Sequence, residues 1–418
     1  MTKIRFKKVI VGTVLNDNPP GEMNTFSNVG DLNNDGRPDI VISGRNGRMV
    51  WLENTGKEEQ WPQHLIDEVD KMECGGSLWD LTGNGYLDIV NGGDWRSDEI
   101  YWWENPGAGG GRWTKRTIAQ TGSGQFHDTV IGDVTGDGTM SLVFDNQQAP
   151  GGTAVYRVPL PANGVARDRA ARDRVARDPR MSPWPDLEVI ATGKTEPNPY
   201  RDSGVQPEEG LAIGDLDGDG QNELVCGTHW YKYLDGAWVG HKFATGYITT
   251  KVAIGDVDAD GKNEIVLSEG DPCVYGKVQG GKVAWFKPKG DVTDMWEEHV
   301  LEDGLLDAHS LQLGDITGDG YLDILVGEVG VADAETDSYV TRPPRILVFE
   351  NQGPAAFQHK GKRSGSFSRH VVDEGTGIHD GLLVDMRNRG VLDIVGKPLH
   401  GEEKWNVHVY YNTRRPQR

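Results

Sequence analysis

The chain has 418 residues, of which 43 are Lys or Arg and 64 are Asp or Glu, giving a formal net charge of −21. Such an excess of acid argues against a nucleic-acid partner or an anionic membrane surface, because phosphates would be repelled. Three cysteines are an odd number and too few for a disulfide framework. No stretch approaches the ~20 apolar residues of a membrane span.

The first residues, MTKIRFKKVIVGTV, include a short apolar run. They lack the longer apolar region and the small-residue cleavage site of a secretory signal peptide. We therefore expect a cytoplasmic protein. A secreted chain whose leader had been removed would begin in the same way, so secretion is the alternative.

An acidic turn followed by a β-branched run recurs along the chain, as in GDLNNDGRPDIVISG and GDITGDGYLDILVGE. The first aspartates of the seven copies are Asp31, Asp80, Asp133, Asp215, Asp256, Asp315 and Asp385. We call them the anchor aspartates. Their spacing, mostly about 40 to 80 residues, is typical of a repeat architecture.

Each copy has the pattern of four strands. A short alternating strand precedes the anchor and a β-branched strand follows it. An aromatic strand such as VWLENTG comes third, and a strand such as WPQHLI comes fourth. Seven such units with Gly-rich turns predict an all-β, seven-bladed β-propeller that forms a single domain over residues 1–418.

The two ends of the chain predict how the propeller closes. The sequence begins with a fourth-strand pattern, IRFKKVIV, and ends on a third-strand pattern, VHVYYN. We expect the N-terminal strand to complete the last blade, because closure removes an open sheet edge.

Residues 162–181, ANGVARDRAARDRVARDPRM, interrupt the repeat. The Ala-Arg-Asp repetition is strongly charged and has no apolar periodicity. We expect an exposed insertion between the third and fourth blades. An arm that docks a partner is the alternative.

The acidic turns begin like an EF-hand loop and end differently. An EF-hand that started at Asp215 would need a bidentate Glu at position 12, where the chain has Cys226; Glu223 closes a shorter loop at position nine. Side chains at positions one, three, five and nine can offer oxygens to one hard cation, which predicts structural Ca²⁺. The candidate ligands are Asp31, Asn33, Asp35 and Asp39; Asp215, Asp217, Asp219 and Glu223; Asp256, Asp258, Asp260 and Glu264; and Asp315, Asp319 and Asp323.

Hydrogen bonding of these side chains to their own turn backbone is the alternative to a bound ion. The seventh turn carries Arg387 and Arg389 where carboxylates are expected, which favours a salt bridge there. All the turns join the first and second strands of their blades. They are therefore expected on one face of the disc.

The opposite face is predicted to collect histidines. First strands line the channel of a propeller, so the residues six positions before each anchor aspartate should ring its mouth. These residues are Thr25, Cys74, His127, Glu209, Thr250, His309 and His379. Three of the seven are histidines, in a chain that has 11 in total.

Further polar and aromatic side chains are expected on the same face. They are His229, His400, Glu269 and Glu328 at the ends of second strands, Trp95 and Trp230 beside these ends, and Tyr200 and Arg201 in the loop TEPNPYRDSGVQPEEG. Histidine and tyrosine transfer protons near neutral pH, and arginine or a metal neutralises a carboxylate or enolate. Imidazole and carboxylate ligands suit Zn²⁺ or another divalent ion.

These residue types divide into two predicted groups. The candidate catalytic residues are His127, His309, His229, His379, Glu209, Tyr200 and Arg201. The candidate substrate-binding residues are Trp95, Trp230, His400, Glu269 and Glu328. Tryptophan faces stack on sugar rings, but packing between blades is an equal alternative for Trp95 and Trp230.

The repeats DLDGDGQNELVCG and DITGDGYLDILVG resemble the FG-GAP/VCBS propeller repeats of integrin α-subunits and many bacterial proteins. The segments FHDTVIGD and AHSLQLGD, and WWENPG followed by WTKRTI, resemble more closely the propeller domain of fungal aldos-2-ulose dehydratase. That resemblance implies a metal-dependent dehydratase site, carried over to His127 and His309 and then His379. The architecture is also similar to that of propeller polysaccharide lyases, which perform β-elimination.

We therefore expect a carbohydrate-active carbon–oxygen lyase or dehydratase that acts by β-elimination on a keto-sugar or a uronate-containing sugar at the channel mouth. A non-catalytic propeller that binds a glycan or a protein on the same face is the alternative, because both functions use the same residue types. A purely structural repeat protein is the third hypothesis. The sequence leaves the oligomeric state open.

Overall fold

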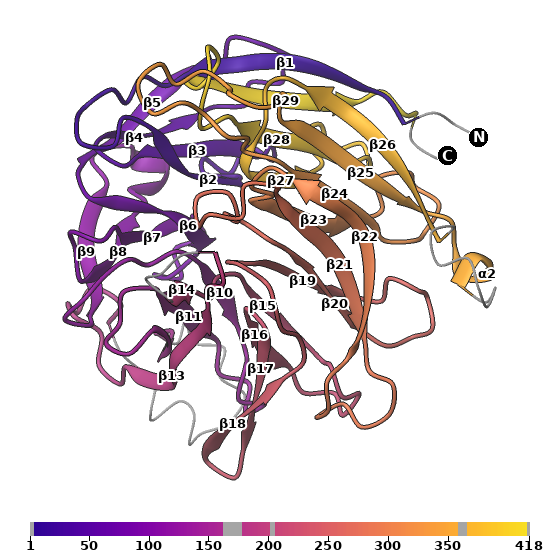
Figure 1. Ribbon diagram of the computed structural model, residues 1–418. Coiled ribbons are helices and arrows are strands. Elements are labelled where there is room, and N and C mark those ends of the chain that lie inside the picture. The colour runs from indigo at the N-terminus through magenta and orange to yellow at the C-terminus, as the bar shows by residue number, and fades with distance from the viewer. Residues whose placement is uncertain (1–3, 162–177, 201–204, 358–365, 416–418) are drawn as a thin grey trace.

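The computed structural model describes residues 4–161, 178–200, 205–357 and 366–415. Seven antiparallel sheets stand around a central axis like the blades of a propeller (Figure 1). Six sheets have four strands and one has five. Within each sheet of blades one to six the strands follow chain order from the axis outward. The predicted seven-bladed β-propeller is confirmed.

The strands are grouped by their place in the blade. The first, innermost strands are β2 (Asn24–Gly30), β6 (Met72–Trp79), β10 (Thr129–Gly132), β15 (Leu211–Gly214), β19 (Lys251–Gly255), β23 (Ser310–Gly314) and β27 (His379–Val384). The second strands are β3 (Asp39–Gly44), β7 (Asp88–Gly93), β11 (Ser141–Asn146), β16 (Glu223–Cys226), β20 (Glu264–Ser268), β24 (Asp323–Gly327) and β28 (Asp393–Lys397). The third strands are β4 (Gly47–Leu52), β8 (Glu99–Glu104), β12 (Thr153–Pro159), β17 (His229–Leu234), β21 (Gly281–Lys287), β25 (Arg345–Asn351) and β29 (Asn406–Asn412). The fourth, outermost strands are β5 (Gln63–Val69), β9 (Thr114–Gln120), β13 (Glu188–Pro197), β18 (Ala237–Lys242), β22 (Glu297–Leu305), β26 (Phe367–Glu374) and β1 (Phe6–Thr13).

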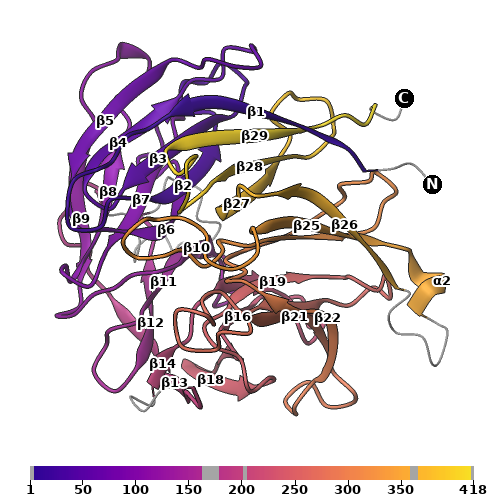
Figure 2. The same cartoon turned by 45° about the horizontal axis from the view of Figure 1, so that its top comes forward.

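The N-terminal strand closes the ring. Strand β1 pairs antiparallel with β29, with Val9 opposite Val409, and the two strands lie side by side in both views (Figures 1 and 2). Val11 is fully buried and packs in one cluster with Ile40 of the first blade and Val409 of the last. The predicted closure is confirmed, and it joins the two ends of the chain in one core.

The third blade departs from the four-strand pattern. A short fifth strand, β14 (Val205–Pro207), pairs with β13 on its outer edge. This strand was not predicted, because its segment is short and follows the proline-rich loop before it. Two short helical segments, η1 (Gly107–Gly109) and α2 (Pro354–Phe357), lie outside the sheets. Most of the predicted charged insertion, residues 162–177, lies outside the described residues.

Asparagine side chains bond neighbouring blades together beneath the acidic turns. Asn105 follows β8, and its backbone N–H donates to Asp88 of the same blade at 2.8 Å. Its side-chain amide donates to the carbonyl of Leu32 in the preceding blade at 3.0 Å. Equivalent inter-blade bonds run from Asn54 to Met386, from Asn351 to Val257 and from Asn412 to Ile316.

The described residues contain no helix that is long and apolar enough to cross a membrane. The acidic turns occupy the loops between first and second strands, as predicted. The other ends of the first strands bring their preceding residues together at the opposite mouth of the channel.

Candidate functional site

Side chains from all seven blades gather at the mouth of the channel opposite the acidic turns. The seven residues six positions before the anchors are all buried: Thr25, Cys74, His127, Glu209, Thr250, His309 and His379. They lie just before or within the first few residues of the first strands, which converge on the axis. Five of them form one contact chain, from Cys74 through His127, Glu209 and His309 to His379.

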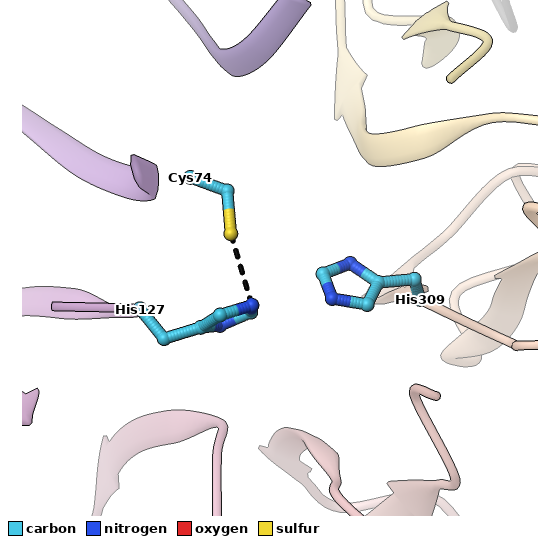
Figure 3. Close-up of side chains that lie close together, drawn as sticks. All are labelled: Cys74, His127 and His309. Carbon is cyan, nitrogen blue, oxygen red and sulfur yellow. Dashed lines mark hydrogen bonds between the residues drawn. The ribbon is translucent and has the colours of Figure 1, made fainter. Parts of the chain in front are cut away.

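His127 lies between Cys74 and His309 (Figure 3). Its Nε2 is 2.9 Å from the thiol sulfur of Cys74, and its Nδ1 is 2.9 Å from Oδ2 of Asp128. The His127 ring meets that of His309 edge to face, with centroids 5.0 Å apart. A carboxylate on Nδ1 sets the ring orientation and leaves Nε2 for chemistry toward the axis.

Two carboxylates from neighbouring blades face the same imidazoles. Oε2 of Glu209 lies 3.5 Å from Nε2 of His127 and 3.9 Å from Nε2 of His309. Oδ2 of Asp271, on the loop after β20, lies 3.7 Å from Nε2 of His309. The Asp271 side chain is 26% exposed, whereas those of the other three are 2–5% exposed. Asp271 therefore marks the side of the cluster that is open to solvent.

Charged residues one position further along the first strands also face the cluster, and they were not predicted from the sequence. Nζ of Lys251 lies 3.0 Å from Oδ1 of Asp128 and 3.8 Å from Oδ1 of Asp380, so it bridges two blades. Nδ1 of His379 lies 3.2 Å from Oδ2 of Asp380. The same nitrogen lies 3.1 Å from Nζ of Lys397. The repeated His-Asp pairs at 127–128 and 379–380 were the available signal.

Burial and neighbouring charges separate the pKa values of the cluster in the metal-free protein. Burial alone would lower the pKa of His127, but Cys74 and Glu209 outweigh it and raise that pKa well above the usual value. Burial lowers the pKa of His309 and holds that of His379 well below its usual value. Burial raises the pKa of Glu209 to about 8. Groups with such separated pKa values can serve as proton donors and acceptors.

A polar cavity of about 210 Å³ lies on the channel side of the cluster. It is lined by residues of all seven first strands or the residues just before them, including Ser27, Asp128, Lys251, His309 and Asp380. The histidine cluster therefore stands between this cavity and the open face.

The cluster fits a divalent cation. One ligand atom each from His127, Glu209, Asp271 and His309 lies within 4.8 Å of the others. Oε2 of Glu209 is buried and has no hydrogen-bond partner in the described part of the chain. Two imidazoles and two carboxylates suit Zn²⁺ and related divalent metals, and a bound cation would satisfy the buried oxygen.

Two predicted histidines, His229 and His400, have partners outside this cluster. His229 contacts the buried carboxylate of Glu208 at 3.2 Å, and Nδ1 of His400 lies 2.8 Å from Asp337. Tyr200 is 43% exposed. Arg201 lies outside the described residues. The structure does not bring His229 or His400 into contact with His127.

Three of the residues predicted to bind substrate, Trp230, Glu269 and Glu328, are buried and contact other parts of the protein. Trp230 is 1% exposed and packs among core aromatics such as Phe243. This is the packing role that was the alternative to sugar stacking for this residue. Glu269 accepts backbone N–H bonds from Ile248 and Lys282 and pairs with Lys277.

Glu328 is the third of these residues. It accepts the backbone N–H of Leu306 and pairs with Arg342 and Arg345. Like Glu269, it is fully buried, so its carboxylate orders a loop and cannot meet a ligand from solvent.

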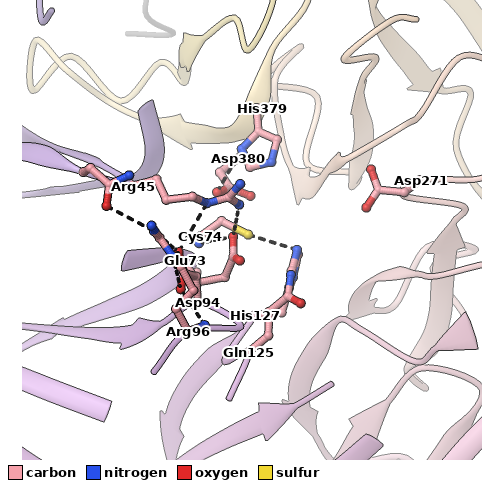
Figure 4. A network of polar contacts seen from close by, with 12 residues as sticks. Arg45, Glu73, Cys74, Asp94, Arg96, Gln125, His127, Asp271, His379 and Asp380 are labelled. Atoms are coloured by element: carbon pink, nitrogen blue, oxygen red, sulfur yellow. Dashed lines mark hydrogen bonds and ion pairs between the residues drawn. The ribbon is translucent and has the colours of Figure 1, made fainter. Parts of the chain in front are cut away.

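Trp95 remains on the surface next to the cluster. Its side chain is 49% exposed, and the guanidinium groups of Arg45 and Arg96 lie 4.8 and 5.2 Å from its ring centroid. Arg45 bonds Glu73 at 2.8 Å, and Glu73 immediately precedes Cys74 (Figure 4). A polar network therefore connects the exposed indole to the buried histidines.

The acidic turns use most of their predicted ligands to order the turn itself. The position-nine carboxylates Asp39 and Asp323 are fully buried, and both of their oxygens accept backbone N–H groups. Ligand atoms of Asp215, Asp217 and Glu223 do lie within 4.8 Å of one another, as do those of Asp256, Asp258 and Asp260. Acidic groups that can hold a cation are thus present in the fourth and fifth turns.

The FG-GAP-like repeat family matches residues 80–144, which include the second and third acidic turns. A search of curated proteins finds no significant match. The V. cholerae biofilm matrix protein Bap1 is similar in structure over 100% of this chain and 92% of its own, with 11% identity and a TM-score of 0.52.

Two further solved structures align with lower scores. The rhamnogalacturonan lyase YesW aligns over 99% of this chain and 77% of its own, with 13% identity and a TM-score of 0.49. YCF48 from Cyanidioschyzon merolae aligns over 98% of both chains, with 9% identity and a TM-score of 0.46. At these identities the similarity to Bap1 supports the fold alone. The chain is a seven-bladed β-propeller that carries an FG-GAP-like repeat.

Proposed function

We propose that this protein is a metal-dependent carbon–oxygen lyase or dehydratase that acts on a keto-sugar or uronate-containing sugar at the channel mouth. One observation carries the proposal. Four ligand atoms from four blades converge there, and Oε2 of the buried Glu209 has no hydrogen-bond partner among the described residues. The resemblance of FHDTVIGD and AHSLQLGD to a dehydratase propeller agrees with this placement.

In this proposal His127, Glu209, Asp271 and His309 hold the cation, which supplies a Lewis acid for a carbonyl or carboxylate oxygen. Asp271 and the open face beside it admit the sugar. The ligand set combines two neutral imidazoles with two carboxylates, so the site retains little net charge once a divalent ion is bound.

His379 is the proposed proton-transfer residue. Burial keeps its pKa well below the usual value, so the imidazole is neutral and can accept a proton. The carboxylate of Asp380, 3.2 Å from Nδ1, stabilises the imidazolium that forms when His379 accepts a proton. His379 removes the proton next to the carbonyl, the electron pair forms the carbon–carbon double bond, and the β carbon–oxygen bond breaks. The same proton then passes to the departing oxygen, so the net change is loss of water or an alcohol.

Metal content and turnover test this proposal together. We would measure bound metal by elemental analysis of the desalted protein and then screen keto-sugars and uronates for ultraviolet absorbance of an unsaturated product. The H127A/H309A double variant should lose both the metal and the product. His64, on the outer strand of the first blade, provides the control variant H64A, which should keep both. A double variant with unchanged metal and turnover would refute the proposal.

Trp95 favours a second candidate function, glycan binding without turnover. Its exposed indole lies beside two guanidinium groups, a combination that suits an acidic sugar. This candidate predicts that W95A weakens glycan binding more than H127A/H309A does, and that no product forms with any tested sugar. Isothermal titration with acidic oligosaccharides distinguishes the two.

A further inference from the structure

The fourth and fifth blades differ from the others in the residue that closes the acidic turn. In both blades position nine is a glutamate, Glu223 or Glu264, whereas Asp39, Asp88 and Asp323 occupy it in the first, second and sixth. The third strand differs at the matching place. Pairing of Leu224 with Tyr231 sets Lys232 beside Glu223, and pairing of Ile265 with Phe286 sets Lys287 beside Glu264.

Lys232 extends into the fourth acidic turn. Its Nζ lies 2.7 Å from Oδ2 of Asp219 and 3.0 Å from Oε1 of Glu223, and it also pairs with Asp217. The Lys232 side chain is 9% exposed. The remaining carboxylate, Asp215, accepts the backbone N–H groups of the turn glycines. The ammonium group thus occupies the place among the side-chain oxygens that a metal ion would take.

Lys287 repeats this arrangement in the fifth turn. Its Nζ lies 2.5 Å from Oδ2 of Asp258, 2.6 Å from Oδ2 of Asp260 and 3.2 Å from Oε1 of Glu264. Asp256, like Asp215, accepts backbone N–H groups of its own turn. Two independent copies of the repeat therefore place a lysine at the same point.

The first, second and sixth blades, which have aspartate at position nine, lack such a lysine. In the third strands, Leu52, Trp103 and Phe349 pair with Ile40, Ile89 and Ile324, which follow the position-nine aspartates. The next third-strand residues stand where Lys232 and Lys287 stand, and they are Glu53, Glu104 and Glu350. In these blades both oxygens of the position-nine aspartate are already bonded to backbone N–H groups. The longer glutamate leaves an oxygen for a cation, and the lysine appears only where that glutamate is present.

We infer that Lys232 and Lys287 are built-in cations that take the place of Ca²⁺ in the fourth and fifth turns. Calcium requires several oxygen ligands at short distance, and an ammonium group held by three carboxylates occupies those oxygens. The structural calcium expected from the sequence of these two turns therefore does not fit the arrangement of their side chains. This inference is independent of the metal proposed at the channel mouth, which lies at the opposite face.

The inference predicts that calcium dependence can be created by removing the lysines. In the wild-type protein, addition of Ca²⁺ should not change the Tm. The K232M/K287M variant should lose stability in EGTA, recover it on addition of Ca²⁺, and bind Ca²⁺ more than about 10-fold tighter by calorimetry. The control is K262M, which removes one exposed positive charge beside the fifth turn and should behave like the wild type.

Two results would overturn the inference. One is a Ca²⁺-dependent rise in the Tm of the wild-type protein that disappears in D217N/D258N. The other is a K232M/K287M variant that folds but does not respond to Ca²⁺. The wild-type measurement decides the question even if the double variant does not fold, and neither readout involves the ligands at the channel mouth.

Discussion

Oε2 of Glu209 lies 3.5 Å from Nε2 of His127, although the two residues enter the channel mouth from different blades. Their first strands, β15 and β10, both begin at the axis, so the residues before them meet across the blade boundary. A contact between consecutive repeats thus builds the proposed site. It also leaves one buried carboxylate oxygen for a cation.

Replacement of Glu209 by glutamine keeps the side-chain shape and removes the carboxyl group that can ionise to bind a cation. We expect E209Q to lower the affinity for the proposed divalent ion by more than about 10-fold, because a neutral amide is a poor ligand. Competition with a chromophoric chelator measures this affinity. The neighbouring Glu208, which bonds Thr228 and His229 instead, provides the control E208Q. Equal metal affinity in the two variants would contradict the assignment.

Replacement of Lys251 by methionine should destabilise the fold. Its ammonium compensates the buried carboxylates of Asp128 and Asp380, and removal of one partner from a buried ion pair costs about 3–5 kcal/mol. Urea unfolding would report this loss. Lys7, whose pair with Glu58 is exposed, provides the control K7M, with an expected change below about 1 kcal/mol. Similar stabilities of the two variants would show that Lys251 does not hold the channel together.

The closing strand β1 can be tested with two adjacent residues. Val11 is fully buried in the core shared by the first and last blades, whereas Ile10 is 44% exposed. We expect V11D to destabilise the protein by more than about 3 kcal/mol, because it buries an unpaired charge. I10D should change stability by about 0.5 kcal/mol or less. Thermal unfolding followed by circular dichroism distinguishes them, and a mild effect of V11D would mean that closure does not depend on this core.

Lys397 should make stability depend on pH. The side chain is fully buried, and burial lowers its pKa from 10.5 to about 8. Between these values the unfolded chain binds a proton that the folded protein does not, so the free energy of unfolding rises with pH, by about 3 kcal/mol in all.

The K397M variant isolates this contribution. It lacks the titrating amine, and its lost contact with His379 costs the same at every pH to a first approximation. The wild type should therefore gain stability relative to K397M as the pH rises from 8 to 10, measured by urea unfolding at each pH. Parallel pH profiles of the two proteins would exclude an ionisable Lys397 with a lowered pKa.

Several features of the channel mouth follow directly from the repeat. The anchor aspartates mark the turn of every blade, so counting six residues back locates His127, Glu209 and His309 at equivalent positions. Strand polarity then fixes that these positions share one face. The exposed location of Trp95 was also consistent with its place in the pattern.

Other features depended on partners that the repeat does not specify. Trp230 has the same spacing from its anchor as Trp95, but it packs against Phe243 and is buried. Glu269 and Glu328 lie on the predicted face, yet lysine or arginine side chains and backbone N–H groups enclose them. Spacing along a strand gives the height of a side chain in the blade, but loop residues decide whether solvent reaches it.

The sequence by itself determined the seven-bladed architecture, its closure by the N-terminal strand and the set of histidines at the channel mouth. These properties follow from local periodicity and from the alternation of strands and turns. Both patterns recur in every repeat. Only the tertiary structure decided that Lys251 bridges Asp128 and Asp380, and that Lys232 enters the fourth acidic turn. These ion pairs form because the strand register and the closed ring of blades bring particular charged side chains within a few ångströms of one another. The local sequence pattern does not specify the distance between side chains in different strands or blades.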